Sequence, residues 1–126
     1  MARSYRELVV WQKGIQLTTQ IYKLTKSFPR EEIYGPTSRM RRAAVSIPSN
    51  IAEGAGLLHA PEYRHFLGVA RASNFESQTQ LASTRELEFG EPALIDLAEG
   101  LSHEVGKMLY ATIASLNNPV KSEPRV

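Results

Sequence analysis

Cysteine is absent from this chain of 126 residues. Its absence excludes disulfide bonds and thiolate metal sites, and it is typical of a reducing compartment. The chain has the length of one domain, which is enough to bury an adequate core without crosslinks. We therefore expect a single domain whose stability comes from packing.

Long hydrophobic runs are also missing. No apolar stretch approaches the roughly 18 residues that a membrane-spanning helix needs, and residues 1–7 lack the apolar region and cleavage site of a secretory signal. We therefore expect a cytoplasmic protein. No alternating apolar stretch is bounded by turn signals, so strands are not expected either.

Charge of one sign is not in large excess, but it is unevenly spread. The net charge is +2. Residues 1–50 carry nine Lys or Arg against three Glu, a net +6, and residues 51–126 carry six against ten acids, a net −4. This asymmetry can attract a polyanion to the first half, orient like subunits, or merely solvate the surface.

The first helical segment opens with a capping-box pattern at Ser4–Glu7 and is predicted to end near Phe28. It carries two apolar stripes about 110° apart on the helical wheel, more than one bundle core requires. One stripe consists of Leu8, Trp11, Ile15, Thr18, Tyr22 and Thr25. From the other stripe, four residues are predicted to face a neighbouring chain: Val10, Leu17, Ile21 and Leu24.

Three further helical segments follow. The second begins near Pro36 and is predicted to kink at Pro48, where Ser46 or a water would satisfy the carbonyl of Ala44 that the proline leaves unpaired. Its core stripe is Met40, Ala44, Ile47, Ile51, Ala55 and Leu58. The third segment runs from Pro61 to about Phe89, with a polar middle. The fourth runs from Pro92 to about Leu116.

Long helices joined by short turns pack antiparallel. The predicted fold is therefore all-α, an antiparallel up-down-up-down four-helix bundle over residues 1–118. Residues 119–126 are predicted to form a flexible tail.

The sequence offers no convincing catalytic or metal site. Glu62 and His65 match half of a di-iron motif, but His103, in the fourth segment, would lie about 20 Å away along the bundle. Gly54–Gly56 has no preceding strand and no following Lys, so it is expected to end the second helix instead of cradling phosphate. We expect no enzyme activity, no cofactor and no metal.

The back of the second helix is unusually poor in charge. Ser46, Ser49, Asn50 and Glu53 lie on or beside the face opposite the core stripe. Small residues there would allow another helix to approach closely, whereas a merely solvated face would carry more Lys and Glu. We therefore predict that these four residues contribute to an oligomer interface.

Basic residues form a second candidate site. Arg39, Arg41, Arg42 and Lys13 are the residues predicted to bind nucleic acid. The three arginines point in different directions and would not make one patch on a monomer, but a ring of subunits would repeat them as a basic belt. Phosphate contacts through such a belt would be salt-sensitive and blind to sequence.

The segment from Arg41 to Gly54, RRAAVSIPSNIAEG, closely resembles the signature of a family of small bacterial four-helix-bundle proteins. These proteins are encoded in intervening sequences of 23S ribosomal RNA genes and are also called S23 ribosomal proteins. Accessory variability determinant proteins of diversity-generating retroelements are related to them. Further similar stretches are Leu8–Lys13, Phe28–Gly35 and Glu62–Leu67.

The resemblance implies an antiparallel bundle assembled as a homopentameric ring, without enzyme activity. For the retroelement branch it implies binding to nucleic acid and to a reverse transcriptase. Leu57 replaces a basic residue of the family pattern, which weakens the nucleic-acid expectation. Our first hypothesis is a self-assembling scaffold or adaptor, and the alternative is an accessory factor that binds RNA or a ribonucleoprotein.

Overall fold

Four long α-helices make up the structure. The computed structural model describes residues 4–57 and 59–117. Its main elements are α1 (Val9–Thr25), α2 (Ser38–Ala55), α3 (Ala60–Leu87) and α4 (Pro92–Leu116). α1 packs against α2 and α4, and α3 packs against the same two helices, so the four helices close around one core.

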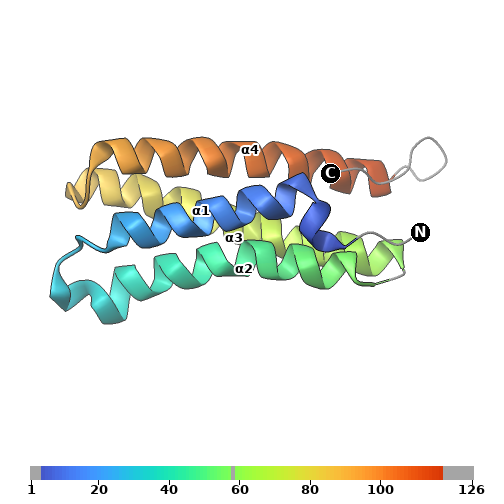
Figure 1. The fold of residues 1–126 in the computed structure, drawn as a ribbon, viewed down its shortest axis with the longest axis horizontal. Helices are drawn as coiled ribbons and strands as arrows, with labels where there is room; N and C mark the ends of the chain where they lie inside the picture. The colour runs from blue at the N-terminus through green and yellow to red at the C-terminus, as the bar shows by residue number, and fades with distance from the viewer. Residues whose placement is uncertain (1–3, 58, 118–126) are drawn as a thin grey trace.

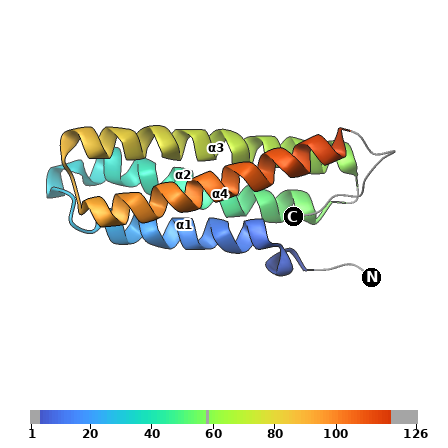
Figure 2. The same ribbon diagram turned by 90° about the horizontal axis from the view of Figure 1, so that it is seen from above.

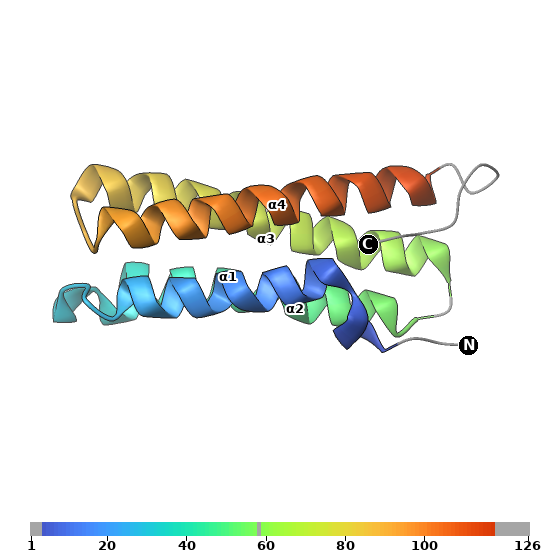
Figure 3. The same ribbon diagram turned by 45° about the horizontal axis from the view of Figure 1, so that its top comes forward.

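The helices alternate in direction, so α1 begins at the end of the bundle where α4 finishes (Figure 1). Figure 2 shows that α4 is inclined to α1 and does not run strictly alongside it. Figure 3 separates the pair α1 and α2 from the pair α3 and α4. The predicted antiparallel four-helix bundle is therefore confirmed.

The start of α1 differs from the predicted capping box. Ser4 caps a short 3-10 turn, Tyr5–Glu7, and its hydroxyl accepts the amide of Arg6 at 3.1 Å instead of the amide of Glu7. Leu8 is extended, so α1 begins only at Val9. The turn is held against α1 because the side-chain amide of Gln12 donates to the Arg6 carbonyl at 2.9 Å.

The core is formed by the aliphatic stripe of α1, which corrects one prediction. Val10, Leu17, Ile21 and Leu24 are each at most 1% exposed within a single chain, so they are not available to a neighbouring subunit. They pack with buried residues of the other helices, including Met40, Ala44, Ile47, Ile51, Leu67, Leu81, Val105 and Leu109. The aliphatic stripe faces inward because its side chains are fully apolar and fill a dry core.

α2 remains one helix through Pro48, so the proline does not break it. The carbonyl of Ala44 loses its usual i+4 donor there, and the sequence suggested Ser46 or water as a substitute. In the structure the hydroxyl of Thr18 on α1 lies 3.1 Å from this carbonyl. Gly14 allows this approach, since a Cβ at that position would lie 3.3 Å from Pro48 Cβ.

The polar middle predicted for α3 is buried against α4. Asn74 is 1% exposed and Ser102 is fully buried. The Asn74 amide donates to the Ser102 carbonyl at 3.0 Å, and the Ser102 hydroxyl donates to Asn74 Oδ1 at 2.8 Å. These two bonds satisfy both ends of the amide, which makes burial of this polar pair tolerable.

The connections fall close to their predicted places. α2 ends at Ala55, and Gly56 is its C-terminal cap. The prediction that the segment Gly54–Gly56 ends the second helix is therefore confirmed. Between α3 and α4, Gly90 has a φ of 71°, and a Cβ there would meet Leu24 Cδ1 at 2.6 Å.

Leu58 and the predicted tail, residues 119–126, lie outside the described residues. No helix in the described part of the chain is long and apolar enough to cross a membrane.

Candidate self-association surface

The other stripe of α1 lies on the outside of the bundle. Ile15 is 40% exposed and Tyr22 is 44% exposed, and Trp11 is half-buried. Val45 on α2 and Leu97 on α4 continue this apolar strip on either side of α1. We name these five residues the α1 surface. The first helix therefore has two apolar faces, as predicted. The face exposed to solvent is the stripe that contains Trp11, Ile15 and Tyr22.

Aromatic side chains gather at the beginning of the α1 surface. The rings of Tyr5 and Trp11 meet edge to face, with 5.3 Å between their centroids. The guanidinium of Arg6 lies over both rings, 5.7 and 5.5 Å from the two centroids. Such aromatic groups with a polar edge are enriched in the contact regions of protein interfaces.

A groove between α1 and α2 runs along one side of the surface. Two hollows, of about 270 and 510 Å³, share Val45 and so follow one another along the seam. The first contains Trp11 and Ile15, and the second contains Tyr22 and Ile33. The first hollow is lined mainly by apolar residues, so another apolar surface displaces its water favourably, whereas the second also carries Arg41 and Arg42.

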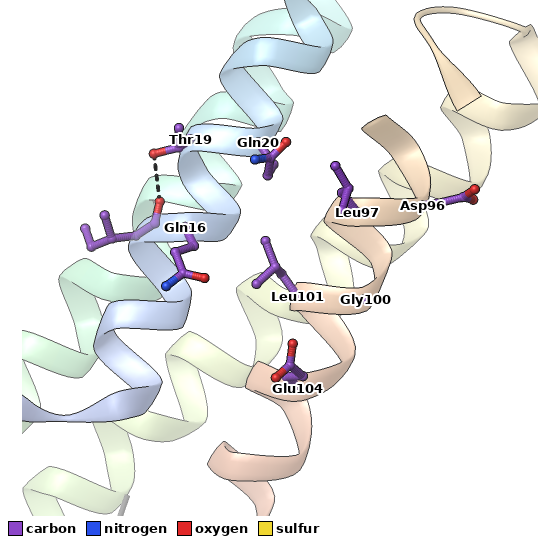
Figure 4. Close-up of a pocket in the computed structure, with 9 residues that line it drawn as sticks. Gln16, Thr19, Gln20, Asp96, Leu97, Gly100, Leu101 and Glu104 are labelled. Atoms are coloured by element: carbon purple, nitrogen blue, oxygen red, sulfur yellow. Dashed lines mark hydrogen bonds between the residues drawn. The ribbon is translucent and has the colours of Figure 1, made fainter. Parts of the chain in front are cut away.

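A second groove, of about 500 Å³, lies between α1 and α4 on the other side of Ile15. In Figure 4, Leu97 and Leu101 project from α4 toward α1, where Gln20 projects into the same gap. Gly100 also lines this groove, and a Cβ placed there would meet no atom within 4 Å. The missing side chain leaves room for another backbone to approach α4.

The predicted interface residues at the back of α2 fall into two pairs. Ser46 reaches α3, since its hydroxyl lies 2.8 Å from the hydroxyl of Ser73, and the Asn50 amide donates to the Ser46 hydroxyl at 3.0 Å. Ser49 and Glu53 are exposed. Ser49 lines the α1–α2 groove, so it borders the α1 surface.

The four predicted nucleic-acid residues are not brought together in one chain. Lys13 pairs with Glu104 on α4 at 3.1 Å. Arg41 is held by two groups of α1, since its Nε donates to the Thr25 hydroxyl at 2.9 Å and its guanidinium lies 4.5 Å from the Tyr22 ring centroid. Arg39 and Arg42 are exposed.

Arg39 and Arg42 also face different sides of α2. Arg39 lines a small hollow between α2 and α3, whereas Arg42 lines the α1–α2 groove. The arginines thus diverge on a single chain, as the sequence predicts, and their common action in a ring stays a prediction.

Metal-ligating residues do not cluster in the described part of the chain. Among residues 4–57 and 59–117, no three of His, Cys, Asp or Glu lie close enough together to hold a metal ion. His65 on α3 packs edge-on against the Phe66 ring, with 5.2 Å between their centroids. The pattern of Glu62 and His65 is therefore not completed by ligands from other helices.

Sequence reasoning missed most of the α1 surface because it assigned the wrong stripe to the outside. A usable signal was present: within α1 the apolar residues of the buried stripe are aliphatic, and its aromatic member, Phe28, has no polar atom. The outer stripe contains Trp11 and Tyr22, whose polar atoms favour a partly wet position. Val45 and Leu97 depend on how α2 and α4 are rotated, which a single sequence does not reveal.

Comparison with known proteins supplies the family. No curated protein sequence matches this chain. The sequence pattern of the family described as 23S rRNA-intervening sequence proteins matches residues 6–111. The match includes the whole of α1, α2 and α3 and most of α4. The chain belongs to the 23S rRNA-intervening sequence protein family.

Proposed function

We propose that this protein is a non-enzymatic, self-assembling helical bundle that acts as a scaffold or adaptor, with the homopentamer as its assembled form. The observation that supports assembly most strongly is the α1 surface. Ile15, Tyr22 and Val45 are each at least 40% exposed, and they lie together along one seam. Contiguous exposed apolar residues of this kind mark interaction sites on soluble proteins.

The two grooves beside α1 suit a closed ring. A ring forms when one patch of each subunit contacts a different patch of the next. The α1–α2 groove presents aromatic rings and arginines, whereas the α1–α4 groove presents leucines and the bare backbone of Gly100. Ile15 lines grooves on both sides of α1, so both contacts would include it. The number five rests on the resemblance described above.

Substitution of Ile15 tests this assembly. Ile15→Lys places a charge in both grooves, and we expect it to convert the assembly to monomers at micromolar concentration. Leu87→Lys is the matched control, because Leu87 is also exposed, at 54%, but lies on α3 away from the α1 surface. An Ile15→Lys variant with normal helical circular dichroism and the same mass as the wild type would refute this use of the α1 surface.

A second candidate function, binding of RNA or a ribonucleoprotein, is favoured by Arg39 and Arg42. Both are exposed, and no carboxylate of the described residues pairs with either. A ring would repeat them around its axis. Structured RNA should then bind with an affinity that falls steeply with salt, and Arg39→Gln with Arg42→Gln should flatten that dependence. Absence of binding at low salt would remove this candidate.

A further inference from the structure

A groove on the opposite side of the bundle combines positive charge with exposed aromatic rings. It lies between α3 and α4 and has a volume of about 350 Å³. Its position is distinct from α1 and from Arg39 and Arg42. The residues that carry the argument are Arg71, Phe75, Gln78, Gly106, Lys107 and Tyr110. We name this site the α3–α4 groove.

The two rings of the groove are joined by one guanidinium. The Arg71 guanidinium carbon lies 5.0 Å from the Phe75 ring centroid and 5.5 Å from the Tyr110 ring centroid. Phe75 is 50% exposed and Tyr110 is 63% exposed, so each ring still presents surface to solvent. A planar ligand can stack on such surfaces, and the contact is favourable for any base.

The cations of the groove are not neutralised. Within the described chain, no carboxylate forms an ion pair with Arg71 or Lys107. The acids farther along the same seam, Asp96 and Glu99, are both held by Arg85, at 2.7 and 2.8 Å. The groove is thus locally positive, although residues 51–126 carry a net −4.

The floor of the groove provides a hydrogen-bonding group. Gly106 leaves the floor open, since a Cβ there would lie 3.2 Å from the Asn74 amide nitrogen. Asn74 itself is occupied by Ser102. The neighbouring Gln78 is half-buried and has no hydrogen-bond partner in the described chain, so its carboxamide is free to pair with a ligand.

We propose that the α3–α4 groove binds single-stranded nucleic acid. One unstacked base lies against Phe75 or Tyr110, and the adjoining phosphates lie near Arg71 and Lys107. A volume of about 350 Å³ is at the lower end of the range for ligand pockets, roughly 300–1,000 Å³, which fits a single base better than a larger ligand.

Single strands account for the whole groove better than other polyanions do. An acidic peptide would use Arg71 and Lys107 but would give no role to two exposed rings and a free carboxamide. A duplex keeps its bases stacked within the helix and presents mainly phosphates. This inference does not require the α1 surface, and it places nucleic acid on a different face from Arg39 and Arg42.

Binding of a short fluorescein-labelled oligouridine to the whole chain, followed by anisotropy, tests the proposal. Phe75→Leu with Tyr110→Leu removes both rings and keeps an apolar surface, and we expect roughly 5- to 150-fold weaker binding per lost stack. Tyr110→Phe is the matched control and should bind like the wild type. An oligonucleotide of the same length without bases should bind weakly to all of these variants.

The remaining outcomes separate the alternatives. Equal binding of the base-free probe and oligouridine, or an unchanged affinity after removal of both rings, would overturn stacking in the groove. If the double variant Arg39→Gln with Arg42→Gln loses binding and the double variant Arg71→Gln with Lys107→Gln keeps it, nucleic acid does not bind in the α3–α4 groove. That result would overturn the proposal and support the second candidate function instead. Displacement of oligouridine by polyglutamate at comparable concentration would favour an acidic peptide and would also overturn it.

Discussion

The hydroxyl of Thr18 donates to the carbonyl of Ala44 across the α1–α2 seam, at 3.1 Å. Pro48 has no N–H and so leaves this carbonyl without its helical donor. The same hydroxyl lies 2.9 Å from the Gly14 carbonyl, so its single proton is shared between two acceptors. The hydrogen-bond donor that Pro48 removes from α2 is thus replaced by the Thr18 side chain of α1.

Replacement of Thr18 by valine tests the value of this bond. Valine keeps the shape of the side chain but removes the hydroxyl, so the carbonyl of Ala44, a residue that is fully buried, would be left unpaired. We expect the free energy of unfolding to fall by about 1–3 kcal/mol, measured by urea denaturation. Thr19→Val is the control, because the exposed Thr19 hydroxyl bonds only the Ile15 carbonyl of its own helix. Equal losses of unfolding free energy in Thr18→Val and Thr19→Val would contradict the stabilising role of the Thr18–Ala44 hydrogen bond.

Two helical glycines, the buried Gly54 on α2 and the exposed Gly68 on α3, should respond oppositely to alanine. A Cβ at Gly54 would lie 2.9 Å from Phe66 Cβ and 3.0 Å from Tyr63 Cδ1, which is too close. A Cβ at Gly68 meets nothing within 4 Å. We expect Gly68→Ala to stabilise by up to about 1 kcal/mol, from helix propensity, and Gly54→Ala to destabilise by about 1–3 kcal/mol, from overpacking.

Thermal unfolding of the two alanine variants tests whether one is stabilised and the other destabilised. Stabilisation of both variants would show that α2 and α3 move apart easily at Gly54, and the close contact between these helices would then carry little energy.

The buried pair of Asn74 and Ser102 should be costly to break. Ser102→Ala removes the donor to Asn74 Oδ1 and leaves that oxygen unpaired in the core. We expect a loss of about 1–3 kcal/mol in the free energy of unfolding. Ser83→Ala on the exposed side of α3 should stay within about 0.5 kcal/mol of the wild type. Parallel urea titrations compare them, and a neutral Ser102→Ala would mean that the pair is not buried as described.

Alkaline pH should weaken the fold through Tyr63. Burial raises the pKa of the Tyr63 hydroxyl above its ordinary value of 10.0, because the charged form is poorly solvated there. The neutral side chain therefore contributes stability that is fully present below about pH 10 and is lost as the pH rises through the raised pKa.

Comparison with Tyr63→Phe isolates this contribution from the other groups that titrate at high pH. We expect the stability of the wild type to fall more steeply above about pH 10 than that of the variant. Unfolding in urea at each pH measures both curves, and parallel curves would rule out this role for Tyr63.

The sequence was sufficient to predict the four helices and their order. Apolar spacing and the prolines placed α2, α3 and α4 to within a few residues, and the RRAAVSIPSNIAEG segment identified the family. Local rules work here because each helix is long and each turn contains Gly or Pro.

The rotation of α1 does not follow from apolar spacing alone, because both of its stripes have helical spacing. The aliphatic residues of one stripe favour burial over Trp11 and Tyr22 of the other, and contacts made by the other helices decide between them. Gly14 lets α1 approach Pro48, and Thr18 supplies the donor for Ala44, which together turn the aliphatic stripe inward. For the same reason the grooves on either side of α1, and the α3–α4 groove, appear only once the helices are placed side by side.

Self-association through the α1 surface is the claim on which the proposed scaffold function depends. Light scattering behind a sizing column, on the wild-type protein at micromolar concentration, tests it most directly. The chain has a mass of 14.1 kDa, and we predict a single species of about five times that mass. A single species at the mass of one chain would contradict the claim.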